Sequence, residues 1–212
     1  MECTPYNKET LKQAVDILKQ GGVIAHPADT CYGLAADFTN EKAIKKIQDI
    51  KGRDNKKAMS IMFPAFMKQD ICEYTELNDL SKMVCKELFP GPITIVLPKG
   101  KKIPDFFFPE NKFIGIRIPY DMMTEDILTK FKRPLVTTSA NASGYDPCAT
   151  CKEVVDIFQN REFQPDLVFE GAIRNKCIPS TVILIKDGNI KILREGPMTK
   201  EQIEGILGVT IA

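Results

Sequence analysis

The sequence lacks a strong net charge and any apolar segment long enough to cross a bilayer. Its 212 residues carry 29 lysines and arginines against 28 aspartates and glutamates, a formal net charge of +1. No global field would therefore draw the chain to nucleic acid or a membrane, and any anion site must be local. No apolar run approaches the roughly 18 residues of a membrane helix, and residues 1–5 show neither a basic start nor a signal segment. We expect a cytoplasmic protein with no membrane partner.

Motifs that mark several common enzyme classes are also missing. The chain has neither a P-loop nor a G-x-G-x-x-G segment, so a nucleotide site must use other donors. It has no Gly-x-Ser-x-Gly elbow, and His26 is its only histidine. A nucleophile–base–acid set is therefore poorly supported. We interpret His26, which precedes Pro27, as a packing residue at a strand end.

The cysteines give no clear framework. Seven cysteines is an odd number for a chain without an export signal, which predicts reduced thiols rather than disulfides. Only Cys148 and Cys151 have a suggestive spacing. A structural zinc needs four ligands, and the sequence offers no second close pair. A redox pair at a helix start is an alternative, because the helix dipole favours a thiolate there, and two incidental loop residues are the simplest interpretation.

What the sequence does contain is typical of a globular α/β domain. With 43% hydrophobic and 27% charged residues, the chain can bury a real core, and its length suits one domain spanning residues 1–212. Helix and strand signals alternate, which predicts an open sheet flanked by helices. We expect helices near residues 11–18, 40–50, 79–88 and 122–131, and others starting at Thr150 and Thr199, whose spacing to Glu153 and Gln202 is that of a capping box. Strands are expected at 23–25, 59–63, 93–97, 113–118, 135–138 and 167–170, with a hairpin at 181–185 and 190–194 and long loops at 26–37 and 98–112.

Positive charge is concentrated in one short stretch. Between Lys42 and Lys57 the chain has seven lysines and arginines against two aspartates. The first three lysines lie within an expected helix and are typical of a solvated face. Lys51, Arg53, Lys56 and Lys57 instead crowd the exit of that helix, where their side chains can converge on one anion such as a polyphosphate.

Small hydroxyl and amide residues gather at the expected strand ends. Asp29 and Thr30 follow the first strand, Ser139 and Asn141 follow the strand at 135–138, and Ser180 opens the hairpin. Strand ends in open α/β sheets are where ligands tend to bind, and these groups suit a small polar ligand with hydroxyl and carboxylate groups.

Taken together, these segments resemble the successive motifs of the YrdC-like family over nearly the whole chain, from about Leu11 to Met198. The motifs are PADTCYGL at residues 27–34, KGR at 51–53, PGPIT at 90–94, GIRIP at 115–119, SANASG at 139–144, PSTV at 179–182 and ILR at 192–194. One motif alone would be weak, whereas seven in order are specific. The resemblance implies a YrdC-like twisted, open, mixed α/β sheet flanked by helices around a basic concave cavity.

The resemblance also implies an activity and a set of binding residues. Family members are L-threonylcarbamoyladenylate synthases, which combine ATP, L-threonine and bicarbonate into threonylcarbamoyl-AMP and pyrophosphate. The product passes to a downstream transferase that modifies tRNA next to the anticodon. By position, the residues expected to bind threonine are Thr30, Arg117, Ser139 and Ser180. Those expected to bind ATP are Lys51, Arg53, Lys57, Asn141 and Arg194, with Mg²⁺ entering on the phosphates.

The implied chemistry needs no protein nucleophile. A carbamate formed from bicarbonate and the threonine amine attacks the α-phosphorus of ATP, and such transfers depend on positioning and charge neutralisation, here by Lys51 and Arg53. The alternative is a module that binds double-stranded RNA or tRNA without catalysis, because a basic concave surface is also typical of RNA recognition. Small-ligand groups such as Arg117 and Ser180 favour the enzyme.

Overall fold

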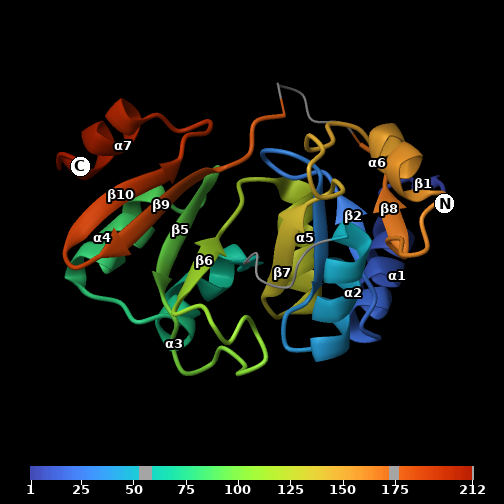
Figure 1. The fold of residues 1–212 in the computed structure, drawn as a ribbon, viewed down its shortest axis with the longest axis horizontal. Helices are drawn as coiled ribbons and strands as arrows, with labels where there is room; N and C mark the ends of the chain where they lie inside the picture. Colours follow the sequence, from blue (N-terminus) through green and yellow to red (C-terminus); the bar gives the residue numbers. More distant parts are fainter. Residues whose placement is uncertain (53–58, 172–176, 212) are drawn as a thin grey trace.

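The computed structural model describes residues 1–52, 59–171 and 177–211, and these form helices and strands in alternation (Figure 1). The helices are α1 (Lys8–Lys19), α2 (Glu41–Lys51), the 3₁₀ helix η1 (Ala65–Asp70), α3 (Ile71–Tyr74), α4 (Asp79–Leu88), α5 (Met122–Phe131), α6 (Cys151–Phe158) and α7 (Lys200–Leu207). The strands are β1 (Cys3–Thr4), β2 (Ile24–His26), β3 (Gly33–Asp37), β4 (Ser60–Met62), β5 (Ile93–Pro98), β6 (Phe113–Arg117), β7 (Leu135–Ser139), β8 (Leu167–Phe169), β9 (Thr181–Lys186) and β10 (Asn189–Arg194). The predicted α/β class is confirmed.

The described strands form one mixed sheet of ten strands in the order β1-β8-β2-β3-β7-β4-β6-β5-β9-β10. Some neighbours are parallel, such as β4 with β6 and β5 with β9, and others are antiparallel, such as β3 with β7 and β5 with β6. Figure 1 shows this twisted sheet, with α4 and α7 beside β9 and β10 at one end and α1, α2 and α6 at the other. The order brings strands from distant parts of the chain into contact at the centre.

Alternation along the strands divides the core between the two faces of the sheet. On one face, Ile24 of β2 and Leu135 of β7 pack with α1 and α5. Their chain neighbours Ala25 and Val136 point to the opposite face, where the buried residues of α2 and α6 pack. This alternation is expected when helices cover both faces of a sheet, because successive strand residues point to opposite sides.

Local signals in the sequence set several element boundaries correctly. Thr150 caps α6 and Thr199 caps α7, each accepting a hydrogen bond from the backbone of the residue three positions on. The hairpin between β9 and β10 turns at Asp187 and Gly188, whose φ angles of 51° and 75° are those of a tight hairpin turn. Phe107 and Phe108 are buried and anchor the loop before β6, as expected.

Strand β3 corrects one sequence expectation, because it lies within the segment predicted as a loop from His26 to Asp37. Its five residues pair with β2 on one side and β7 on the other, and all are buried. The segment, GLAAD, contains no β-branched residue and no alternation of polar and apolar residues, which are the usual strand signals. Pairing on both sides and burial on both faces make it a strand.

The cysteines correct a second expectation. Disulfides join Cys3 to Cys151 and Cys31 to Cys177, so the prediction of reduced thiols is wrong for these four residues. The partners are 148 and 146 positions apart in the chain, and only the sheet and the packing of α6 beside β1 bring them together. Cys148 is a free, buried thiol and Cys151 pairs with Cys3, so the alternative of a Cys148–Cys151 redox pair is wrong, and Cys151 is not an incidental residue.

No helix within the described ranges has both the length and the apolar character needed to cross a membrane.

Candidate functional site

A cavity of about 850 Å³ opens over the central strands. Its floor is built from small residues that are neighbours across the sheet. Ser139 of β7 pairs with Gly33 of β3, and Ser60 of β4 lies between Thr137 of β7 and Gly115 of β6. Because larger side chains at these positions would fill the space, the sequence of small residues creates the hollow.

Gly115 shows how closely this floor is packed. A Cβ atom at this position would lie 2.8 Å from Ser60 Oγ and 2.9 Å from Thr94 Cγ2. Real Cβ atoms essentially never come so close to another atom, so only glycine fits there without movement of its neighbours. The glycine is required here for lack of space.

The four residues predicted to bind threonine, Thr30, Arg117, Ser139 and Ser180, all line this cavity. Arg117 is held by an ion pair with Asp29, in which Nη2 lies 2.7 Å from Oδ1 and the side chains are only 11% and 6% exposed. The same Nη2 lies 3.4 Å from Thr30 Oγ1. Asp29 in turn accepts a hydrogen bond from the backbone of Tyr120. The guanidinium is therefore fixed in place beside the Thr30 hydroxyl.

Ser180 connects a second guanidinium to the same cavity. Its hydroxyl lies 2.8 Å from Thr94 Oγ1, and its carbonyl accepts hydrogen bonds from Nε and Nη2 of Arg194 at 3.1 and 2.8 Å. Partial burial and the positive charge of Arg117 together lower the pKa of Arg194 below its usual value. Two arginines that repel each other across one cavity form a site that an anion would stabilise.

Lys51 lies behind the cavity wall. Its ammonium donates hydrogen bonds to the Ser139 carbonyl at 2.6 Å and to Asn141 Oδ1 at 2.7 Å, and the residue is 2% exposed. Asn141 Nδ2 donates to the carbonyl of Tyr145. Among the described residues, Ser139, Asn141 and Arg194 line the cavity, and Lys51 supports two of them from α2. Arg53 and Lys57, the other predicted ATP residues, lie outside the described residues.

Several residues in or beside the cavity were not assigned to the predicted binding sets. Asp29, which the sequence places at a strand end, and Thr94, which lines the cavity, lie inside motifs that the sequence does show, but their roles as partners of Arg117 and Ser180 depend on contacts between distant strands. Lys112 and its neighbours line another part of the cavity and come from the loop before β6, in which only the aromatics gave a signal. Tyr145 lies at the cavity and is largely exposed.

His26 has the packing role expected of it. It is buried at the end of β2, with Nδ1 2.9 Å from the carbonyl of Pro27. Burial lowers the pKa of His26 below its usual value, so the ring is neutral near pH 7. Within residues 1–52, 59–171 and 177–211, no three histidine, cysteine or acidic side chains gather as a metal site.

Comparisons with known proteins identify similar chains. A family model for Sua5, YciO and YrdC, described as "Telomere recombination", matches residues 16–196. A Methanocaldococcus jannaschii relative is 35% identical over 198 residues, which cover 90% of this chain and 89% of the relative. An Aliivibrio fischeri protein named threonylcarbamoyl-AMP synthase is 30% identical, with 89% of this chain and all of that protein covered.

Solved structures give the same picture of the fold. Pyrococcus abyssi Sua5 complexed with L-threonine is 25% identical, with a TM-score of 0.88 and all of this chain covered. Escherichia coli YciO, at 23% identity and a TM-score of 0.83, shows the same fold over 95% of this chain. The chain spans 63% of the Sua5 chain, and 57% of the curated Pyrococcus abyssi relative.

Proposed function

The chain belongs to the Sua5/YciO/YrdC family, and we propose that it is a threonylcarbamoyl-AMP synthase that makes threonylcarbamoyl-AMP and pyrophosphate from ATP, L-threonine and bicarbonate. One observation carries the proposal: Arg117, Thr30 and Ser180 converge on a single cavity, in a chain whose curated relatives are named for this activity. A Sua5 structure that superposes on the whole chain is a complex with L-threonine. The cavity is also large enough for a nucleotide as well as an amino acid.

In the proposed mechanism, threonine lies at the end of the cavity formed by Thr30, Arg117, Ser139 and Ser180. The Arg117 guanidinium pairs with the threonine carboxylate, because a planar fork of N–H donors matches a carboxylate. Asp29 fixes that guanidinium before the ligand arrives, which reduces the ordering that binding must supply. The hydroxyls of Thr30 and Ser180 then orient the polar groups of the amino acid.

The nucleotide occupies the rest of the cavity in this proposal. Arg194 and Asn141 contact ATP from the cavity wall, Arg53 and Lys57 are the further cations proposed for the phosphates, and Lys51 adds its charge from behind Ser139 and Asn141, to which it donates hydrogen bonds. The threonine carbamate attacks the α-phosphorus and pyrophosphate leaves, while Lys51 and Arg53 offset the charge that develops. Mg²⁺ bound to the ATP phosphates would add further charge neutralisation, because phosphate oxygens and water are the ligands it prefers. The product then serves tRNA modification in the cytoplasm through a downstream transferase.

The test is the dependence of pyrophosphate release on both small substrates. The protein is incubated with ATP and Mg²⁺, and pyrophosphate is measured with threonine, with bicarbonate, with both and with neither. The proposal expects release only when both are present. Pyrophosphate release that does not depend on threonine would refute it. Absence of turnover, with an affinity for tRNA that falls steeply with salt, would instead support the RNA-binding module.

A further inference from the structure

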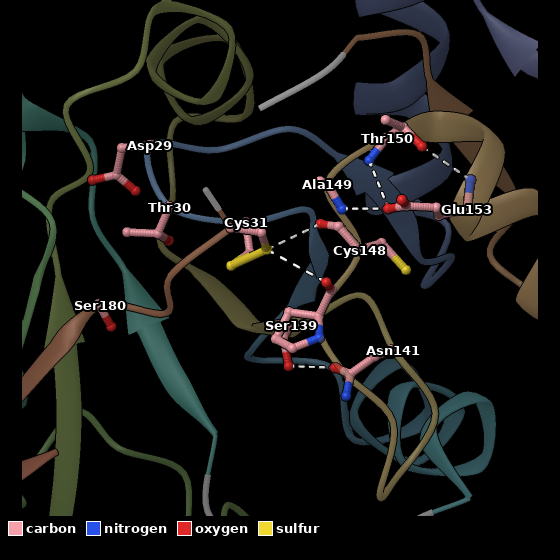
Figure 2. The surroundings of a disulfide bond; sticks show 12 residues. Asp29, Thr30, Cys31, Ser139, Asn141, Cys148, Ala149, Thr150, Glu153 and Ser180 are labelled. Atoms are coloured by element: carbon pink, nitrogen blue, oxygen red, sulfur yellow. Dashed lines mark hydrogen bonds between the residues drawn. A yellow bond between two sulfur atoms is a disulfide. The ribbon is translucent and has the colours of Figure 1, made fainter. Parts of the chain in front are cut away.

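The Cys31–Cys177 disulfide lies beside the cavity, which Cys31 lines. Cys31 directly follows Thr30, and Cys177 comes three residues before Ser180, so each cysteine belongs to a segment that carries a predicted threonine-binding hydroxyl. Their Cα atoms are 5.0 Å apart, and Cys31 itself lines the cavity. Figure 2 shows the disulfide between Thr30 and Cys148. The bond ties the Thr30 segment to the Ser180 segment across 146 positions of sequence.

The surroundings of the pair also accommodate its reduced form. The Cys177 sulfur lies 3.4 Å from the carbonyl oxygens of both Pro147 and Cys148, and Figure 2 marks these contacts. In the reduced protein, the Cys177 thiol can donate its proton to one of these carbonyls. The Cys148 carbonyl is itself fixed by a hydrogen bond from the Tyr32 backbone at 2.9 Å. The Cys177 sulfur therefore has a partner in both redox states: Cys31 when oxidised and a carbonyl oxygen when reduced.

The two sulfurs differ in access to solvent. Cys177 is partly exposed, whereas Cys31 is buried. A reagent from solution reaches Cys177 first, and Cys31 then stands ready to complete the exchange. This is the arrangement of an attacking and a resolving cysteine.

We propose that Cys31 and Cys177 form a reversible thiol modification site on the substrate cavity, which takes a low-molecular-weight disulfide such as oxidised glutathione. The Cys177 thiolate attacks the glutathione disulfide, forms a mixed disulfide and releases one glutathione thiolate. The Cys31 thiolate then attacks the Cys177 sulfur, which forms the Cys31–Cys177 bond and releases the second glutathione. Two protein thiols lose two protons and two electrons, and one glutathione disulfide becomes two glutathione molecules.

The state of this bond sets how well the threonine end of the cavity is organised, an inference that rests on the proposed function. With the bond formed, Thr30 and Ser180 are held in place before threonine binds. With the bond reduced, binding itself must order the two segments, which weakens affinity. The Cys3–Cys151 disulfide provides an internal comparison, because neither of its cysteines lines the cavity.

The first experiment follows the modification itself. The purified wild-type chain is equilibrated in buffers with different ratios of reduced to oxidised glutathione, quenched by alkylation and analysed by peptide mass spectrometry. The proposal expects a Cys31–Cys177 peptide that forms and disappears reversibly as the ratio changes. A pair that stays reduced in every buffer, or a Cys177 that crosslinks to a different cysteine, would overturn it.

The second experiment measures threonine binding by calorimetry in the oxidised and the reduced protein. Reduction is expected to raise the Kd for threonine about fivefold in the wild type. Cys177→Ser should have the weaker affinity in both buffers, whereas Cys151→Ser, which removes the other disulfide, should keep the wild-type response to reductant. The comparison of oxidised with reduced wild-type protein does not depend on whether either variant folds. Equal affinity in both redox states would overturn the role of the bond, and absence of threonine binding in either state would instead count against the proposed function.

Discussion

Asp29 holds Arg117 at the cavity through an ion pair from which water is largely excluded. Asp29→Asn keeps the shape of the side chain but removes its charge, so a neutral hydrogen bond to the guanidinium replaces the ion pair. Charge-assisted hydrogen bonds contribute about 1.5–3 kcal/mol, so we expect the threonine KM to rise about tenfold or more, with a smaller change in kcat. Steady-state kinetics with threonine varied at saturating ATP measure this split.

The matched control for Asp29→Asn is Glu87→Gln, which removes the same charge from an exposed ion pair with Lys86. Exposed pairs contribute about 0–1 kcal/mol, so Glu87→Gln should leave both kinetic constants near the wild-type values. If Asp29→Asn lowered kcat and left KM unchanged, Asp29 would not act by positioning Arg117 for the substrate.

Gly115 gives a second prediction at the scale of one residue. Gly115→Ala places a methyl group against Ser60 and Thr94 in the cavity floor, where the neighbouring atoms leave no room for it. Overpacking of this kind costs about 1–3 kcal/mol, so the free energy of unfolding should fall by that amount. Urea denaturation followed by circular dichroism measures it.

Gly205 in α7 is the control for Gly115, because a Cβ there meets nothing within 4 Å. Gly205→Ala should raise the free energy of unfolding by about 0.5–1 kcal/mol through helix propensity. The double variant Gly115→Ala/Ser60→Ala removes one of the two close contacts and should recover part of the loss. If the double variant were no more stable than Gly115→Ala, crowding against Ser60 would not be the cause.

At this scale, the sequence could indicate which residues gather at the cavity but not the partners that hold them. Thr30 and Ser180 were singled out at strand ends and Arg117 through the family resemblance, and all three line the cavity. Asp29 and Thr94 lie in the same motifs, but their importance comes from partners 88 and 86 positions away. Spacing along one chain carries no information about such contacts, and only the folded sheet brings them into reach.

Helix α2 and the loop after β7 are joined by the side chain of Lys51. Its ammonium donates to the Ser139 carbonyl and to Asn141, so one element fixes the position of another. Lys51→Met keeps the length of the side chain and removes both charge-assisted hydrogen bonds, although the Ser139 carbonyl keeps the Asn141 backbone N–H and Asn141 Oδ1 keeps the Ser139 hydroxyl as donors. We expect the free energy of unfolding to fall by about 1.5–3 kcal/mol, measured by urea denaturation.

Lys45 serves as the control for Lys51, because it lies on the exposed face of the same helix. Lys45→Met should change the free energy of unfolding by less than about 0.5 kcal/mol. A Lys51→Met protein as stable as Lys45→Met would show that the loop is held by other contacts.

Elements with local signals were predicted well, and elements that depend on distant contacts were not. The helix that begins after Thr150 could be placed because its cap and Glu153 are neighbours in sequence. Strand β3 could not, because its stability comes from pairing with β2 and β7 rather than from its own side chains. The two disulfides were missed for the same reason.

At the scale of the whole molecule, the near-zero net charge conceals an uneven distribution. Arg117 and Arg194 line one cavity from β6 and β10. Along the sequence, three other strands separate β6 from β10. The charge of Arg117 contributes to the lowered pKa of Arg194, so the fold keeps two cations close at some cost in stability. This local excess suits a small anionic ligand better than the backbone of a long nucleic acid.

The response of the whole fold to pH depends in part on His26, the only histidine in the chain. Burial lowers the pKa of His26 in the folded state, with smaller opposing effects from the Pro27 carbonyl and Asp121. The unfolded chain therefore binds a proton at a higher pH than the folded chain does. Below the ordinary histidine pKa of about 6.5 the unfolded state holds more protons, so stability falls as the pH falls.

We therefore expect the free energy of unfolding to decrease by up to about 1.4 kcal/mol per pH unit as the pH falls from about 6.5 towards the lowered pKa of His26. His26→Asn retains a donor that can reach the Pro27 carbonyl but cannot titrate. Its profile between about pH 7 and 5 should be flatter than that of the wild type, because no histidine remains and most carboxylates titrate at lower pH. Urea denaturation at a series of pH values gives both profiles. Parallel profiles would mean that His26 binds its proton equally well in both states, and that its burial does not control the acid sensitivity of the fold.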